Sequence, residues 1–346
     1  MKKTTPPARR FARALRALAF PTLRHLPFLV AAAALAGTFG CTAEKPAPFR
    51  IGINAWPGYE FLYLAQEMGF YRKEGLEVRV VEFSSLSDAR RAYERGQINV
   101  IAATVIEVLQ IRDHSQRSLQ IVQVIDFSSG ADVILARPGL TNAAGLRGAR
   151  IGVELASLGV YVLVRGLEQG GLGLADGKLV SMDQLSMEDA FRKGELDAVV
   201  TYPPTSIQLL RDTKANTVFS TADIPGEVVD VIAVEAELNT QRPGDVAKLL
   251  RAYHRAIAYA RQNPAEAYRI MAEREGITPE EFHASLTDGI QLLSESDQAD
   301  YFRPGGKLAA VIDASDRILR QSGQIKGPDR RSNASTAAFA GKGTTP

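Results

Sequence analysis

The sequence predicts an α/β protein with two lobes, each a mostly parallel sheet flanked by helices, joined by a hinge of two chain segments. Three observations lead to this prediction. Beyond an N-terminal export segment about 300 residues remain, more than a single hydrophobic core usually serves. Short β-branched runs alternate with helical stretches between residues 49 and 219. A helix–strand unit also occurs twice, about 98 positions apart, which suggests two lobes built on one plan.

The first 40 residues have the character of an export signal. They carry basic residues and no acidic one, and their apolar stretch at 26–36 is too short to cross a membrane, which takes about 20 residues. The small Gly40 directly before Cys41 resembles a lipoprotein signal that is cut before a lipidated cysteine. We therefore expect removal of 1–40, lipid on Cys41, and a tether at 41–48 that holds the protein in the periplasm or at the outer face of the cytoplasmic membrane. Cleavage after Ala36 is the alternative, and it would leave Cys41 as a free thiol.

Composition excludes several classes of function. The net charge is +2 and the basic excess lies in the export segment, so no nucleic-acid partner is expected. With one cysteine and four histidines, none in an i, i+4 pair, we expect neither a disulfide framework nor a metal site. There is no nucleophile elbow and no Walker-type glycine loop, so we expect no enzyme, no catalytic residues and no cofactor. The expected protein is a monomer that binds a small molecule.

The central region reads as a series of strands and helices. Helices are predicted at 61–68, closed by Gly69, and at 88–95, between an N-cap at Ser87 and Gly96. The β-branched runs predict strands at 50–53, 78–83, 100–103, 120–125, 132–136, 150–153, 178–181, 198–201 and 228–234.

The repeated unit is AYERGQINVI at 92–101 and AFRKGELDAV at 190–199. In each copy a helix, started at Ser87 or Ser186, docks an aromatic residue and stops at a C-cap glycine, Gly96 or Gly194. A polar pair then leads into a buried strand. The match residue class by residue class supports two lobes of similar construction.

After the second lobe the chain becomes helical. Residues 245–260 carry one apolar stripe, and capping-box starts with proline follow at 263–266 and 278–281. These helices supply no sheet and must cover an existing core, so the chain is expected to leave lobe 1 within 126–136 and return within 228–234. The predicted boundaries are 49–130 and 232–326 for lobe 1, 131–231 for lobe 2, and a disordered tail at 327–346, which is rich in Ser, Thr, Ala and Gly.

Five motifs resemble one family of proteins. They are IGINAWPGY at 51–59, LAQEMGFY at 64–71, GLEV at 75–78, GQIN at 96–99 and SGAD at 129–132. Together they look like the nitrate, sulfonate, taurine and thiamine-precursor family of periplasmic binding proteins, over about 49–323. The resemblance implies the type II periplasmic-binding-protein fold and a ligand passed to an ABC permease in the membrane. A related fungal pyrimidine-synthesising enzyme shares the fold, but its cysteine-rich iron motif has no counterpart here, because Cys41 is the sole cysteine.

The candidate ligand-binding residues follow from the position of the strands. In open α/β sheets, ligands bind outside the carboxyl ends of the strands. The polar and aromatic residues at these positions are Asn54, Trp56, Tyr59, Ser84, Ser85, Thr104, Asp126, Ser128, Ser129, Glu154, Ser157 and Tyr202.

Each candidate has a structural alternative. Trp56 lies in a turn and is either a lid over the cleft or a plug under the loop. Ser84, Ser85 and Ser157 precede helix starts, where their hydroxyls can cap; helix N-termini aimed into one cleft can also bind an anion without an arginine. Asp126 and Asp230 lie in the crossing strands, where an acid usually bonds the backbone or a hinge partner. Glu107 is expected on a solvated helix face.

The solute itself stays open at this stage. No Lys or Arg directly follows a candidate strand, so an oxyanion would depend on hydroxyls and helix ends. Aromatic and acidic groups fit equally an amine or a flat heterocycle stacked on Trp56. Nitrate, bicarbonate, sulfonate and pyrimidine all remain candidates. A sensory module that reports to a membrane receptor, and a pyrimidine-synthesis-type enzyme, are the alternative functions.

Overall fold

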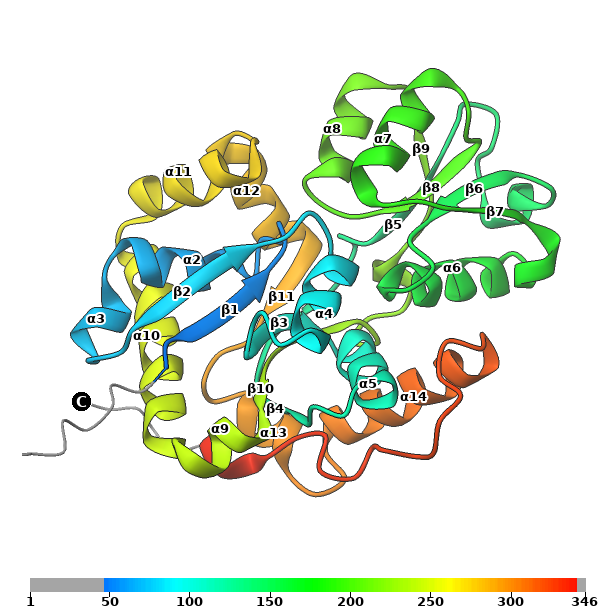
Figure 1. The fold of residues 1–346 in the computed structure, drawn as a ribbon. Coiled ribbons are helices and arrows are strands. Elements are labelled where there is room, and N and C mark those ends of the chain that lie inside the picture. Colours follow the sequence, from blue (N-terminus) through cyan, green and yellow to red (C-terminus); the bar gives the residue numbers. More distant parts are fainter. Residues whose placement is uncertain (1–46, 341–346) are drawn as a thin grey trace, which may run out of the picture. The chain divides into compact units, whose positions relative to one another are not determined.

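A computed structural model describes residues 47–340. The predicted export signal, Cys41 and most of the predicted tether lie outside these residues. The described strands form two separate sheets, and helices pack on both (Figure 1). We call the sheet that contains the first strand, with its helices, lobe 1, and the other lobe 2. The predicted α/β class with two sheets is confirmed.

Within residues 47–340 the sheet of lobe 1 has six strands in the order β11-β4-β10-β3-β1-β2. Their bounds are β1 (Phe49–Ile53), β2 (Val78–Glu82), β3 (Val100–Thr104), β4 (Leu119–Ser128), β10 (Val229–Glu235) and β11 (Ile290–Leu292). Strand β1 is parallel to both its neighbours, whereas β10 is antiparallel to β3 and β4.

The sheet of lobe 2 repeats this plan in the order β7-β6-β8-β5-β9. Its strands are β5 (Val133–Ala136), β6 (Arg150–Val153), β7 (Lys178–Ser181), β8 (Ala198–Thr201) and β9 (Asn216–Ser220). Strand β6 is parallel to β7 and β8, and β5 is antiparallel to β8 and β9. Each sheet is therefore a parallel set of three strands extended by antiparallel ones. The sequence reading missed β9 and β11.

The helices connect and cover these strands. Because right-handed crossovers run from β1 to β2 in one direction and from β2 to β3 in the other, their helices lie on opposite faces of the sheet (Figure 1). The helices are α2 (Glu60–Glu67), α3 (Phe70–Lys73), α4 (Leu86–Glu94), α5 (Val105–His114), α6 (Leu158–Gln169), α7 (Gln184–Lys193), α8 (Thr205–Asp212), α9 (Ala236–Gln241), α10 (Pro243–Gln262), α11 (Pro264–Glu275), α12 (Pro279–Ala284), α13 (Gln298–Phe302) and α14 (Lys307–Gln321).

The N-caps of the two repeated helices differ from the prediction. Ser85, which the sequence also offers as a cap, and not Ser87, caps α4, since its hydroxyl accepts from the backbone N–H of Asp88. Asp183, and not Ser186, caps α7 through the N–H of Ser186. Each helix starts two or three residues earlier than its sequence pattern suggests because a better-placed side-chain acceptor precedes it.

The internal repeat extends to matching contacts in three dimensions. The backbone N–H of Arg50 donates to Asn99 at 2.8 Å, and that of Arg150 donates to Asp197 at 2.8 Å. Both arginines also donate to the carbonyl of the glycine that ends the repeated helix, each at 3.0 Å. A second arginine in each lobe covers the docked aromatic ring: Arg117 lies over Tyr93 and Arg137 over Phe191. The two lobes thus share one helix–strand construction.

Two chain segments cross between the lobes. The first follows β4 and leads to β5, and the second leads from β9 back to β10. The hydroxyls of Ser128 and Thr221 join the two segments at 2.6 Å. Since β10 lies in the lobe 1 sheet from Val229 onward, the chain returns to lobe 1 before the predicted boundary at 232.

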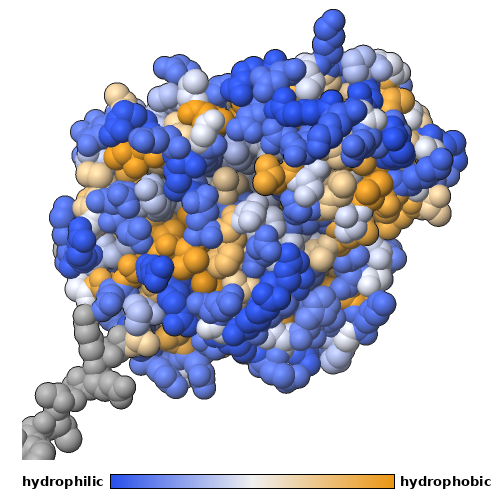
Figure 2. Space-filling model, turned by 45° about the horizontal axis from the view of Figure 1, so that its top comes forward, coloured by the Kyte–Doolittle hydropathy of each residue, from blue (hydrophilic) through white to orange (hydrophobic). Residues whose placement is uncertain are grey.

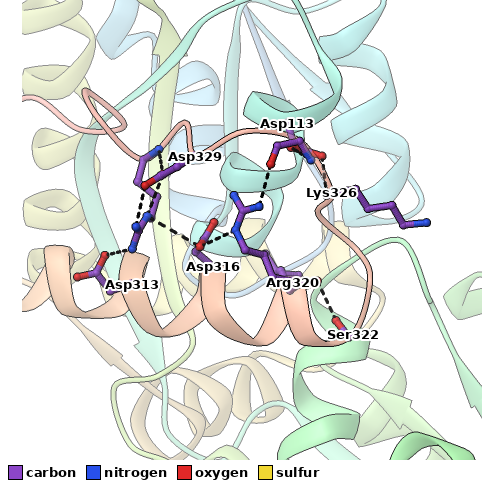
Figure 3. A network of polar contacts seen from close by, with 10 residues as sticks. Asp113, Asp313, Asp316, Arg320, Ser322, Lys326 and Asp329 are labelled. Carbon is purple, nitrogen blue, oxygen red and sulfur yellow. Dashed lines mark hydrogen bonds and ion pairs between the residues drawn. The ribbon is translucent and has the colours of Figure 1, made fainter.

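Residues 327–340 differ from the predicted disordered tail, because they pack along lobe 1. The N–H of Gly327 donates to Asp113 of α5 at 2.9 Å, and its carbonyl accepts from Arg320 of α14 at 2.8 Å (Figure 3). Arg331 pairs with Asp313 of α14 and with Asp329 (Figure 3). Charged side chains of lobe 1 therefore hold a segment whose own composition lacks an apolar pattern.

The described surface carries little clustered apolar area. On the face in Figure 2, hydrophobic residues appear in several separate groups among hydrophilic ones. Leu185 and Leu210 are the exposed large hydrophobic side chains in the part of the chain that the structure describes. None of the helices within residues 47–340 has the length and apolar character to cross a membrane.

Candidate functional site

A small cavity lined by aromatic, aliphatic and polar side chains lies between the two lobes at the ends of their strands. Its lining residues are Asn54, Trp56, Tyr59, Leu86, Thr104, Asp132, Leu158, Tyr202 and Asp230. The free space in it is about 10 Å³, which is about the room that one water molecule needs on the same measure. Tyr202 and Leu158 belong to lobe 2 and most of the others to lobe 1, so the cavity is an interlobe site in a closed arrangement.

Three aromatic rings from both lobes meet at this cavity. Trp56 contacts Tyr59 with ring centroids 6.3 Å apart, and it meets Tyr202 edge-on at 6.2 Å. Trp56 is only 4% exposed, so it fills the space between the lobes instead of lying over an open cleft. Trp56 therefore lines the cavity as a buried ring, and its contact with a solute stays a prediction.

Two aspartates on the crossing strands lie side by side at the site, and one of them, Asp230, lines the cavity. Asp126 on β4 and Asp230 on β10 are register partners in adjacent strands. The indole N–H of Trp56 donates to Asp126 at 3.3 Å, and the hydroxyl of Tyr59 donates to Asp230. Gly58 makes room for this arrangement, because a Cβ there would lie 1.8 Å from a carboxylate oxygen of Asp126.

These two carboxyls are buried side by side, which disfavours their charged forms. Burial raises the pKa of Asp126 to about 7. Burial, followed by repulsion from Asp126, raises the pKa of Asp230 well above its ordinary value. Because two adjacent buried carboxylates repel each other, the pair holds a proton near neutral pH.

Two more acids approach the cavity from lobe 2. Asp132 is 1% exposed and lines the cavity, and burial raises its pKa to about 7. Glu154 follows β6, accepts a hydrogen bond from Ser87 of lobe 1, and also has its pKa raised by burial. Acidic side chains therefore approach the site from both lobes, and none of the described residues that line it is a lysine or an arginine.

Glu107 is a further acid that joins the lobes, and the expected solvated position is wrong. It is fully buried, and one of its oxygens accepts from the Ser157 hydroxyl at 2.7 Å and from the Leu158 backbone N–H at 2.8 Å. Its other oxygen accepts from Thr104 in a capping box at the start of α5. One carboxylate thus serves the N-termini of a lobe 1 helix and a lobe 2 helix.

The predicted site residues fall into three groups. Five of them line the cavity: Asn54, Trp56, Tyr59, Thr104 and Tyr202. Four do not line it but are close to its lining residues in bonding or in sequence: Asp126 bonds Trp56, Ser157 precedes Leu158, Ser85 precedes Leu86, and Glu154 bonds Ser87, which follows Leu86. The remaining three do not line it: Ser128 bonds Thr221 in the hinge, Ser129 bonds the carbonyl of Gly289, and Ser84 is exposed.

Sequence reasoning missed Asp132 as a cavity residue and favoured a bond to the backbone or to a hinge partner for Asp230. Both stand at or near the start of an antiparallel strand. Strand β5 runs antiparallel to β8, so its start lies beside the end of β8, where Val133 pairs with Thr201. Likewise Asp230 pairs with Thr104 at the end of β3. The rule that selects carboxyl ends of strands overlooks such residues, although the crossing segments point to them.

The described residues offer no metal site. No group of three or more His, Cys, Asp or Glu within residues 47–340 is placed to hold a metal ion. The acids around the cavity are instead distributed over both lobes and bonded to hydroxyl, indole and backbone donors. The arrangement suits recognition of a polar organic molecule.

Comparisons with known proteins identify relatives. A family model described as NMT1/THI5 like matches residues 56–267. A protein of Brucella abortus (strain 2308) whose name describes it as a binding protein is 22% identical over 324 residues, which cover 86% of this chain and 98% of that protein. A 4-amino-5-hydroxymethyl-2-methylpyrimidine phosphate synthase of Legionella pneumophila is 20% identical over 222 residues, 63% of this chain and 70% of the synthase.

A solved structure shows the same fold. The alkanesulfonate-binding protein SsuA from Xanthomonas axonopodis pv. citri, bound to MOPS, superposes with a TM-score of 0.73 and 18% identity, over 85% of this chain and 99% of SsuA. The predicted periplasmic-binding-protein fold is thereby confirmed.

Proposed function

Because this chain belongs to the NMT1/THI5-like family, we propose that it is the extracytoplasmic solute-binding component of an ABC importer. The observation that carries the proposal is the cavity between two lobes, lined by aromatic and polar side chains of both. The Brucella relative and SsuA, whose names describe binding proteins, support the same role. In this function the protein captures a small polar molecule as a monomer and delivers it to a membrane permease.

In this proposal each lobe is built on one of the two sheets. Lobe 1 comprises 49–130 together with the chain from β10 onward, and lobe 2 comprises the residues between the crossings. The lobes close over the solute, and the crossing segments around Ser128 and Thr221 bend. Binding then depends on side chains that meet only when the lobes are together, such as Trp56 and Tyr202.

Trp56 provides the test of this site. It is the only tryptophan in the chain, so a solute that displaces water or protein from the indole is expected to change the fluorescence in a saturable manner. In Trp56→Ala, binding measured by calorimetry should be at least about fivefold weaker, since an aromatic contact contributes on the order of 1 kcal/mol beyond its buried area. Tyr259→Ala, which removes a ring that does not line the cavity, should bind like the wild type. If the wild type, Trp56→Ala and Tyr259→Ala bound the solute with equal affinity, the solute would not contact Trp56 and the proposed site would be wrong.

Membrane attachment is a second proposal, and Cys41 carries it. The residue lies outside the described part of the chain, directly after the apolar stretch and Gly40. Cell fractionation should find the wild-type protein with the membrane and Cys41→Ser in the soluble periplasmic fraction. Wild-type protein that is wholly soluble would favour cleavage after Ala36.

One observation favours an enzyme as the second candidate function. The buried pair Asp126 and Asp230 holds a proton near neutral pH, as acid–base catalysts do, and a relative is named as a synthase. The chemical state of the solute after binding distinguishes the binding protein from the enzyme. A binding protein releases its solute unchanged on denaturation, whereas recovery of a converted product would establish the enzyme.

A further inference from the structure

Several buried oxygens around the cavity lack a hydrogen-bond donor. They are Asn54 Oδ1, Asp132 Oδ2 and Glu154 Oε2, whereas the adjacent carboxyls of Asp126 and Asp230 bond each other through the proton that they hold. All five side chains are at most 5% exposed, and Asn54, Asp132 and Asp230 line the cavity itself. Buried polar atoms are nearly always paired in native proteins, so a group of unpaired oxygens at one cavity indicates a ligand that supplies donors.

The charge of the site has the same sign throughout. Asp132 and Asp230 line the cavity, Asp126 bonds Trp56 of its lining, and none of the described residues that line it is a Lys or Arg. The cavity has no compensating cation, and the described residues offer no metal position. A positively charged ligand would therefore supply the missing charge together with the missing donors.

At the start of each of three helices near the cavity, one backbone N–H that could hold an anion is already bonded within the protein. The Leu158 N–H at the start of α6 donates to Glu107. The Ile106 N–H at the start of α5 donates to the Thr104 hydroxyl, and the Asp88 N–H of α4 donates to Ser85. An oxyanion would have to displace these internal acceptors and lie among carboxylates, which makes the helix ends poor anion sites here.

Taken with the aromatic rings, these contacts point to one chemical class of solute. We propose that the cavity binds a small organic cation with several N–H donors, such as a protonated amine or an amidinium group; this rests on the proposed solute-binding function. The N–H groups donate to Asp132 and to the Asp126–Asp230 pair. The cation lies against Trp56, Tyr59 and Tyr202, whose ring faces attract positive charge. Because the aspartates of the pair stand on the two crossing strands, the same cation engages the hinge.

Pairs of probes with one shape and opposite charge test this inference. Acetamidinium matches acetate, and benzamidinium matches benzoate. Calorimetry and thermal unfolding of the purified full chain at pH 8 should show saturable binding of at least one amidinium and none of either carboxylate. Tetramethylammonium, a cation without N–H donors, should bind at least tenfold more weakly than the better amidinium. Mg²⁺, Ca²⁺ and Zn²⁺ serve as controls for simple screening of charge.

Two variants place the binding at the cavity. Asp132→Asn keeps the shape of the side chain and removes its charge, so amidinium affinity should fall at least tenfold. Asp313→Asn removes one exposed acid on α14, outside the cavity, and should leave the affinity unchanged. An equal loss in both variants would mean nonspecific attraction and would overturn the inference, as would unchanged affinity in Asp132→Asn.

The remaining outcomes separate the inference from the function beneath it. If acetate or benzoate binds and is recovered unchanged while neither amidinium binds, the inference that the solute is a cation is wrong and the solute-binding function stands. Binding of an amidinium that is chemically converted supports the cation and overturns the binding-protein function. If neither amidinium probe binds, the inference that the solute is an organic cation is wrong.

Discussion

Replacing Arg274 with methionine is expected to lower the free energy of unfolding by about 3–5 kcal/mol, the usual loss when one partner of a buried ion pair is removed. Arg274 of α11 is almost fully buried and donates through two nitrogens to Glu60 of α2, which is completely buried. It also pairs with Glu82 at 2.9 Å. Arg274 is the cation that offsets the charges of Glu60 and of the neighbouring buried Glu275. Burial, followed by repulsion from Glu60, raises the pKa of Glu275 even with the guanidinium present.

Urea unfolding followed by circular dichroism measures this loss. Arg269→Met on the same helix is the matched control, because Arg269 and its partner Glu273 are 61% and 76% exposed. Such surface pairs contribute about 0.3–0.5 kcal/mol. Similar losses in the two variants would show that the buried pair has no special role in joining α11 to α2.

The second large effect is a dependence of stability on pH. The pKa of Asp126 rises from 3.8 to about 7 on folding, because burial disfavours its charge. The folded state therefore binds more protons than the unfolded chain between about pH 4 and pH 7, and stability falls as pH rises through this window. Asp132 and Asp230, whose pKa values are also raised, add in the same direction. The protein without solute should thus unfold at a lower temperature at pH 8 than at pH 5.

Asp126→Asn is expected to flatten this dependence. The amide stays neutral at every pH, so the variant should gain several degrees relative to the wild type at pH 8 and little at pH 5. Thermal unfolding between pH 5 and pH 8 provides the measurement, and Asp313→Asn, an exposed acid, should keep the wild-type slope. If Asp126→Asn also kept that slope, the carboxyl would not be held neutral by burial.

The sequence supported the fold well because its evidence was local. β-branched runs and helix-ending glycines marked strands and helices in both lobes, and the repeat at 92–101 and 190–199 corresponds to matching contacts around Gly96 and Gly194. Strands β9 and β11 escaped notice because a short strand has little pattern of its own. They form by pairing with β5 and β4, which are distant in sequence.

The candidate site could be predicted only in part. Residues after parallel strands, such as Asn54 and Thr104, followed from the carboxyl-end rule and do line the cavity. Asp132 required knowledge that β5 enters the sheet antiparallel, which depends on the crossing between lobes. Glu107 required knowledge of lobe closure, because its partners Ser157 and Leu158 come from the other lobe.

The bonds between the lobes also bear on how quickly a solute is captured. The cavity has room for about one water molecule, so nothing larger reaches Asp132 while Glu107 holds Ser157 and Glu154 holds Ser87. Entry then passes through a separated state in which both carboxylates have lost these partners. At high solute concentration the capture rate levels off at the rate of that separation. Substitutions at Glu107, which bonds Ser157 and Leu158 and does not line the cavity, can therefore change the speed of uptake without altering a contact to the solute.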